Sequence, residues 1–136
     1  KNKVNFLKPE IIWEIERALT LSNVNYEQAI YNRTKWKKYT DLLFERFDFL
    51  ALPSTQVFPF LEKVKYPTEI NGKNLDTYHR WMEVVVPASL IGLPTISIPC
   101  GFNTKGLPIG IQLIGKYGND KEVLCTSNLI EKSKIE

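Results

Sequence analysis

The longest uncharged stretch of the chain constrains its fold most. Residues 84–104 contain no Asp, Glu, Lys, Arg or His, and the apolar pattern continues to Gly115. The stretch is long enough for a membrane span, but Pro87, Pro94 and Pro99 interrupt it, and a spanning helix needs an unbroken apolar run. The sequence therefore predicts short buried elements here and no membrane association.

Prolines and glycines divide this stretch into its expected elements. Pro87 is placed to start a short helix over 87–90, and Gly92 is placed to end it. Two strands are expected next, over 95–98 and 109–114, and both are apolar on their two faces. Because such strands need cover on both faces, we expect an α/β fold in which helices cover part of a mixed sheet.

Apolar periodicity and capping residues indicate the other elements. Helix starts are signalled by Pro, Asn or Asp ahead of an apolar pattern. The expected elements are a helix that Pro9 opens, a helix over 26–47 capped by Asn25, a strand over 49–52 ended by Pro53, a helix capped by Asn74, and a final helix from Asp120.

The segment 53–74 is the longest expected loop. It contains Pro59, Pro67 and an Asn71-Gly72 turn, and it is too long for a simple connection in a compact domain. One interpretation is a rim or lid over a pocket, and the other is a mobile insertion. The sequence leaves both open.

Composition indicates one soluble globular domain. The chain has 136 residues, 43% hydrophobic and 24% charged, with a formal net charge of +3. Its densest basic cluster, Lys35, Lys37 and Lys38, falls on an expected helix, where a solvated face is the ordinary interpretation. We therefore expect no nucleic-acid partner.

The cysteines and the single histidine do not form a reactive pattern. Cys100 and Cys125 lie in apolar sequence without metal-ligand spacing, which predicts two buried free thiols in a reducing, cytoplasmic compartment. His79 has no Cys, Asp or Glu at ligand spacing, so a packed or half-exposed histidine is expected there and no metal site.

The sequence over 87–102, followed by 106–115, resembles the C-terminal half of amidase-signature enzymes. The similarity is ordered and free of gaps across this core, and weaker similarities surround it. They lie at 9–13, at 48–55 with Ser54 as an inserted residue, and at the aromatic pair Tyr78 and Trp81.

The resemblance implies that the catalytic half is not in this sequence. The family places a Lys–Ser–Ser triad and a Gly/Ser-rich segment in its N-terminal half, and none of the serines here lies in a Gly-rich loop. We therefore expect no catalytic residue in this chain and no activity from it alone. Residues 1–136 are expected to be the C-terminal portion of one amidase-type domain, and the start at Lys1 is expected to lie within a longer protein.

The resemblance also implies a wall of the substrate pocket between Trp81 and Pro94. The candidates for that wall are Trp81, Val85, Ile91 and Leu93. The branch of the family that uses glutamine tends to carry a carboxylate where Met82 stands, so a less polar substrate is expected.

Arg33 has two interpretations. Its aliphatic stem can lie over the core, with the guanidinium at the edge or paired with a carboxylate. The other interpretation is that Arg33 binds a substrate carboxylate.

The resulting functional hypothesis is a hydrolase that cleaves a small-molecule amide to a carboxylate and ammonia or an amine, without a metal or organic cofactor. Its partner would be the missing N-terminal half, on the same or a separate chain. The sequence leaves open whether the protein also forms a homo-oligomer. The alternatives are a non-catalytic binding or structural module derived from an amidase and an unrelated hydrolase that uses a Ser–Lys pair.

Overall fold

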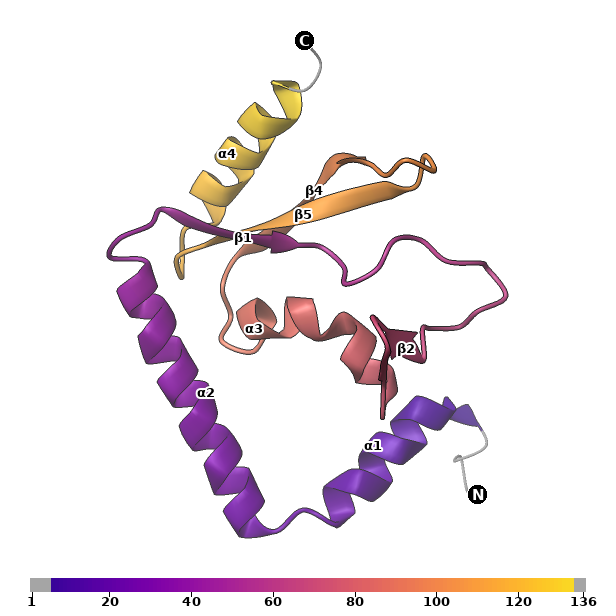
Figure 1. Ribbon diagram of the computed structural model, residues 1–136. Coiled ribbons are helices and arrows are strands. Elements are labelled where there is room, and N and C mark those ends of the chain that lie inside the picture. Colours follow the sequence, from indigo (N-terminus) through magenta and orange to yellow (C-terminus); the bar gives the residue numbers. More distant parts are fainter. Residues whose placement is uncertain (1–5, 134–136) are drawn as a thin grey trace. The chain divides into compact units, whose positions relative to one another are not determined.

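The computed structural model describes residues 6–133. It divides into two compact units, residues 1–36 and 37–136, and the ribbon is drawn in Figure 1. The first unit contains helix α1 (Pro9–Leu19) and most of helix α2 (Asn23–Leu43). The second contains the last turns of α2 and every strand described.

Helix α1 begins at Pro9, as expected. Pro9 occupies the first turn together with Glu10, and Arg17 lies in the last turn, which matches the direction of the helix dipole. No residue of α1 is buried, and four of its large apolar side chains are exposed. Those side chains are Ile11, Trp13, Ile15 and Leu19.

The start of α2 differs from the prediction. Ser22, not Asn25, precedes the helix, because the two residues bond reciprocally: Asn25 N donates to Ser22 Oγ at 3.2 Å, and Ser22 N donates to Asn25 Oδ1 at 3.2 Å. This is a capping box in which Asn25 fills the place usually taken by Glu or Gln. The helix also ends at Leu43, earlier than the expected Phe47.

The sheet of the second unit has the strand order β1-β5-β4, and all its pairings are antiparallel. β1 (Phe49–Pro53) pairs residue by residue with the second half of β5 (Pro108–Gly115). β4 (Thr95–Phe102) lies on the other side of β5 and is longer than predicted. A bulge between Pro99 and Gly101 lets it continue to Phe102.

Helices lie on both faces of this sheet, which confirms the α/β class. Figure 1 shows α4 (Asp120–Lys132) on one side, and η2 (Tyr78–Val85) with α3 (Val86–Ser89) on the other. Neighbouring strand residues point to opposite faces, and the contacts follow this rule. Gly115 faces Val123 of α4, whereas Gln112 bonds to Val84 of η2.

The core is small and lies around β5. Its buried apolar side chains come from the strands, α3, the turn after α3, and α4. They are Ala88, Ile91, Ile98, Leu113, Ile114 and Val123, and the buried polar residues with them are Thr40, Gln112 and Ser127.

The segment between β1 and η2 contains a hairpin that the sequence analysis did not predict. β2 (Glu69–Ile70) pairs with β3 (Lys73–Asn74) across Asn71 and Gly72, whose φ angles are 51° and 76°. An Asn-Gly pair is well suited to such a two-residue turn. Asn74 therefore belongs to a strand rather than capping a helix, and the next helix is a 3-10 helix that begins at Tyr78.

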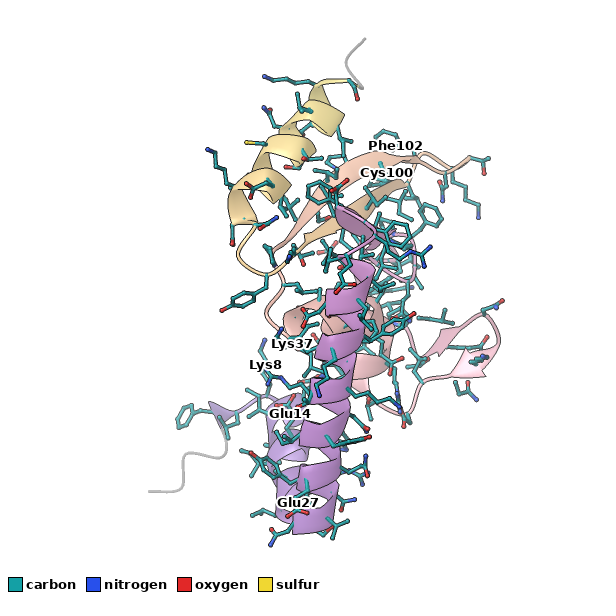
Figure 2. All side chains as sticks on the ribbon, turned by 90° about the vertical axis from the view of Figure 1, so that its left-hand side faces the viewer. Lys8, Glu14, Glu27, Lys37, Cys100 and Phe102 are labelled. Atoms are coloured by element: carbon teal, nitrogen blue, oxygen red, sulfur yellow. The ribbon has the colours of Figure 1, made fainter. Side chains whose placement is uncertain are left out.

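Both cysteines are free but exposed, so the prediction of buried thiols was wrong. Cys100 falls at the bulge of β4, near Phe102 at the strand's end (Figure 2). On α4, Val123 and Ser127 are buried against the sheet, and Cys125, two residues from each, lies on the opposite side of the helix. In residues 6–133, no helix is long and apolar enough to cross a membrane.

The contact between Gly115 and α4 generates a prediction. A Cβ atom at Gly115 would lie 2.3 Å from Val123 Cγ2, so Gly115→Ala forces β5 and α4 apart. We expect a loss of about 1–3 kcal/mol in the free energy of unfolding, measured by urea denaturation.

The matched control adds Val123→Ala, which removes the clashing methyl group. The double variant should lose at least about 0.5 kcal/mol less than the sum of the two single variants. If the losses in the free energy of unfolding were strictly additive, this contact would not limit the packing of α4 against β5.

Candidate functional site

A pocket of about 180 Å³ lies beside η2, where the segment after β1 meets the start of β5. We call it the aromatic pocket. It has no charged side chain in its lining. The lining residues are Thr55, Val57, Phe58, Pro59, Phe60, Trp81, Pro108, Ile109 and Gly110.

Aromatic contacts hold Trp81 in the wall of this pocket. Its ring meets Phe60 edge-to-face, with centroids 5.8 Å apart and planes at 83°, and meets Tyr78 at 6.4 Å and 72°. Tyr78 in turn contacts Tyr66 at 5.3 Å and 82°. These T-shaped contacts are the favoured geometry for aromatic pairs, and they tie η2 to the segment that follows β1.

The indole nitrogen of Trp81 is a buried donor without a hydrogen-bond partner among the described residues. Leaving a buried donor unpaired costs about 1–3 kcal/mol, so such a group is an exception that needs an explanation.

Gly110, on the pocket's lining, allows two strands to meet over it. Ser54 Oγ and Ser97 Oγ lie 2.6 Å apart across β5, and a Cβ atom at Gly110 would lie 2.8 Å from the first and 3.0 Å from the second. The backbone N–H of Ser54 also donates to the Gly110 carbonyl at 2.9 Å. A glycine inside a strand often marks such a close approach of neighbouring groups.

Gln112 joins the sheet to η2. It is 2% exposed, and its Nε2 donates to the carbonyls of Pro53 at 2.9 Å and Val84 at 3.0 Å. Val84 N donates to Gln56 Oε1 at 3.1 Å, so two glutamines hold the end of η2. Sequence reasoning missed this role, although a lone amide in an otherwise apolar strand was the available signal.

The four predicted pocket residues are not all in one place. Trp81 lines the aromatic pocket, but Val85, Ile91 and Leu93 are not in its lining. Val85 is 38% exposed at the end of η2, whereas Ile91 is 4% exposed in the core. Leu93 is half-buried. Contact of all four with substrate therefore stays a prediction.

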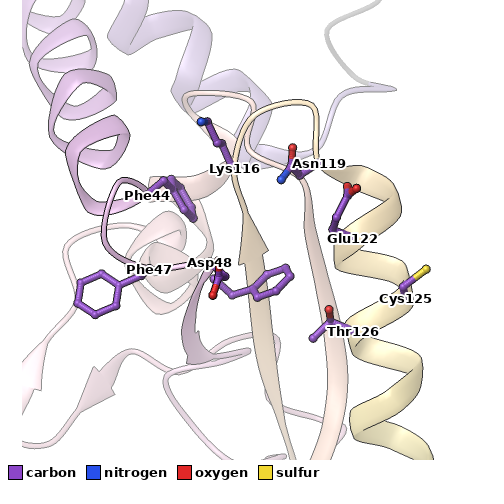
Figure 3. A pocket seen from close by; sticks show the side chains of 9 residues that line it. Phe44, Phe47, Asp48, Lys116, Asn119, Glu122, Cys125 and Thr126 are labelled. Carbon is purple, nitrogen blue, oxygen red and sulfur yellow. The ribbon is translucent and has the colours of Figure 1, made fainter.

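A second pocket, of about 340 Å³, lies between the end of α2, the start of β1 and α4 (Figure 3). Phenylalanine rings and charges of both signs are mixed in its lining, which does not favour one class of ligand. The lining residues are Phe44, Phe47, Asp48, Phe49, Lys116, Asn119, Glu122, Cys125 and Thr126.

The described residues do not assemble a catalytic or metal-binding cluster. No group of three or more His, Cys, Asp or Glu side chains within residues 6–133 could hold a metal ion. Within the same range, neither Ser54 nor Ser97 hydrogen-bonds through its hydroxyl to a lysine or histidine. His79 is half-buried, with its ring 5.4 Å from that of Tyr78, as the sequence analysis expected.

Arg80 is the cation next to Trp81 in sequence, and it is paired with one carboxylate just before η2 and one within η2. Its guanidinium bonds to Asp76 and to Glu83, and these hydrogen bonds raise the pKa of Arg80 above its ordinary value. The charge of Arg80 is therefore directed to these two carboxylates.

Comparisons with known proteins agree on one family. The family model described as Amidase matches residues 1–124. A glutamyl-tRNA(Gln) amidotransferase subunit of Prochlorococcus marinus (strain AS9601) is 40% identical over 112 residues, which cover 81% of this chain and 22% of that protein. The corresponding subunit of Oceanobacillus iheyensis is 36% identical over 110 residues, covering 79% and 21%. The chain thus spans about a fifth of the length of these curated relatives.

Solved structures agree at the level of the fold. A bacterial aryl acylamidase of the amidase-signature family superposes with a TM-score of 0.79 and 25% identity, covering 93% of this chain and 26% of that one. A structure described as an amidase gives a TM-score of 0.76 at 23% identity, covering 93% and 29%.

The role of Gln112 can be tested by Gln112→Leu, which keeps the volume but removes two hydrogen bonds and leaves two carbonyls unpaired. We expect the free energy of unfolding to fall by about 1–3 kcal/mol in urea denaturation. Gln28→Leu is the matched control, because Gln28 Nε2 bonds only to the exposed Asn32 side chain one turn away. Equal effects of the two substitutions would contradict a structural role of the buried amide.

Proposed function

The chain belongs to the amidase-signature family, and from this we propose that it is the C-terminal portion of a hydrolase that cleaves a carboxamide to a carboxylate and ammonia or an amine. The observation that carries the proposal is the family match over residues 1–124, in a chain spanning 22% of the length of a curated relative. In this proposal the chain supplies sheet core and one wall of the substrate pocket.

The chemical step would use residues outside this chain. By resemblance to the family, a serine attacks the carboxamide carbon, a second serine and a neutral lysine relay the proton, and backbone N–H groups stabilise the oxyanion. The serine pair here, Ser54 and Ser97, has no lysine on its hydroxyls among the described contacts, so it is a poor substitute for that triad.

Exposed apolar surface supports a partner for these elements. β1 and β4 are the outer strands of the described sheet, and unpaired strand edges are normally covered. Leu19 on α1 is 83% exposed, and Phe102 at the end of β4 is 75% exposed. We propose that the catalytic N-terminal half, on the same or a separate chain, covers these surfaces.

The class of amide substrate is also part of the proposal. The two relatives named above are glutamyl-tRNA(Gln) amidotransferase subunits, but Met82 stands where the glutamine-using branch tends to carry a carboxylate. We therefore propose a small amide less polar than glutamine, with Trp81, Val85, Ile91 and Leu93 as candidates for the pocket wall. Free Cys100 and Cys125 favour a reducing, cytoplasmic setting for the protein.

A non-catalytic module remains the second candidate. It is favoured by one observation: the described residues contain a pocket but no nucleophile paired with a base. Such a module would bind an amide or a partner surface without turning it over.

One experiment distinguishes the amidase from the non-catalytic module. We expect the coding frame upstream of Lys1 to contain a Gly-Gly-Ser-Ser-like segment preceded by a lysine, and we expect the complete protein to release ammonia from simple carboxamides. Residues 1–136 alone should release none. Inactivity of the complete protein towards a panel of aliphatic and aromatic carboxamides would favour the module, and turnover by residues 1–136 alone would contradict both candidates.

A further inference from the structure

We propose that residues 55–65 form a lid that opens and closes over the aromatic pocket, and that the hydrogen bond from Val84 N to Gln56 Oε1 is the latch that holds it closed. The lid is the first part of the loop between β1 and β2 (Figure 1). This inference goes beyond the proposed function, because it concerns access to the pocket and does not depend on any reaction.

The lid supplies more than half of the lining of the aromatic pocket. Five of the nine lining residues belong to it, and the other four belong to η2 and the start of β5. The five are Thr55, Val57, Phe58, Pro59 and Phe60. If the lid moves away, Trp81 and residues 108–110 are left as an open surface, so the pocket exists only while the lid is closed.

The lid has little structure of its own. Within residues 55–65, all of which the structure describes, there is no helix or strand, and no residue is buried. One backbone hydrogen bond joins two residues of the lid, from Val64 N to the Leu61 carbonyl at 2.9 Å. Segments with so few backbone bonds and buried contacts open at a low free energy, so the lid can move while the sheet stays folded.

Both ends of the lid are anchored. Before it, Ser54 N donates to the Gly110 carbonyl at 2.9 Å, and the hydroxyls of Ser54 and Ser97 lie 2.6 Å apart. After it, the ring of Tyr66 contacts the ring of Tyr78 at 5.3 Å. Motion is therefore confined to the residues between these anchors, which is the arrangement of a hinged lid.

Two contacts hold the lid against η2. Val84 N donates to Gln56 Oε1 at 3.1 Å, and the rings of Phe60 and Trp81 meet edge-to-face at 5.8 Å. Among the described residues, the first is the only hydrogen bond between the lid and η2. One neutral hydrogen bond and one ring pair can break and re-form, because water replaces the hydrogen bond when the lid opens.

The η2 side of the latch is fixed to the sheet. The carbonyl of Val84 accepts a hydrogen bond from Gln112 Nε2 at 3.0 Å, and Gln112 belongs to β5. When the latch breaks, Val84 therefore stays with the sheet, and the lid is the part that moves.

Closure of the lid has a cost that keeps the open state accessible. The indole nitrogen of Trp81 is buried without a hydrogen-bond partner among the described residues, and its ring lies against Phe60 of the lid. We expect opening to admit water to this nitrogen. An unpaired buried donor disfavours the state that buries it, so the two states lie closer in free energy than the contacts alone would place them.

Trypsin cleavage of the complete protein under native conditions tests the lid. Lys63 and Lys65 are exposed sites within it, and Lys105, in the turn between β4 and β5, is an exposed reference site. When opening and closing are faster than cleavage, the rate at each site follows the population of its open form. Mass spectrometry of the fragments gives the three rates separately.

The first variant removes the acceptor of the latch. In Gln56→Leu we expect cleavage after Lys63 and Lys65 to become about 3–10-fold faster, with the rate at Lys105 unchanged. Gln56→Glu keeps an acceptor, and its rates should stay within about 2-fold of the original ones. Gln28→Leu, which changes an exposed amide of α2, is the matched control and should leave all three rates unchanged.

The second variant removes the ring contact and leaves the hydrogen bond in place. Phe60→Leu should speed cleavage at the two lid sites by about 2–5-fold. Phe58→Leu is its matched control and should have a smaller effect, because Phe58 lines the same pocket without a ring contact to η2 among the described residues.

Each result decides the inference without reference to amide hydrolysis, so its failure is distinct from failure of the proposed function. Faster cleavage at the lid sites alone in Gln56→Leu supports it. Equal acceleration at Lys105 indicates wider unfolding and overturns the lid, as do unchanged rates in both Gln56→Leu and Phe60→Leu. Acceleration in Phe60→Leu alone overturns the role of Gln56 as the latch.

Discussion

The second unit depends on burial of both faces of β5. This strand pairs with β1 on one side and β4 on the other, while α4 and η2 lie on its two faces. A strand in that position leaves no solvent for polar groups, so its one amide, Gln112, must satisfy its donors inside the protein. It does so by bonding to the ends of two other elements, at Pro53 and Val84. The aromatic pocket lies where those elements meet.

Two glycines make the close packing around β5 feasible. Gly115 admits the side chain of Val123 on one face, and Gly110 admits the hydroxyls of Ser54 and Ser97 on the other. Glycine in a strand carries an entropic penalty, which the close approach of these neighbours offsets. Gly110 also lines the aromatic pocket together with Trp81 and Phe60, so the pocket lies next to this closely packed part of the sheet.

The parts of the fold that could be predicted from sequence are those set by local signals. Pro87 and Gly92 mark the start of α3 and the turn after it, because proline fixes φ near its helical value and glycine allows the positive φ that ends a helix. Apolar runs mark β4 and β5. Asn74 was misassigned because an Asn ahead of an apolar pattern also signals a helix cap, whereas the Asn71-Gly72 turn just before it pairs it with Glu69. The aromatic pocket could not be predicted, since Phe60 and Trp81 meet only when a long segment folds back onto η2. The exposure of Cys125 likewise depends on which side of α4 faces the sheet.

Recognition and chemistry have different requirements in this chain. The aromatic pocket is built entirely from residues 55–110, so its uncharged lining belongs to the second unit itself. Catalysis needs a nucleophile with a positioned base, and the hydroxyl pair of Ser54 and Ser97 is bonded only within itself among the described side chains. Under the proposed function, the pocket would position a substrate, and a serine outside this chain would attack it. The wall of the pocket that Trp81 forms depends on the position of η2, and Gln112 bonds η2 to the sheet.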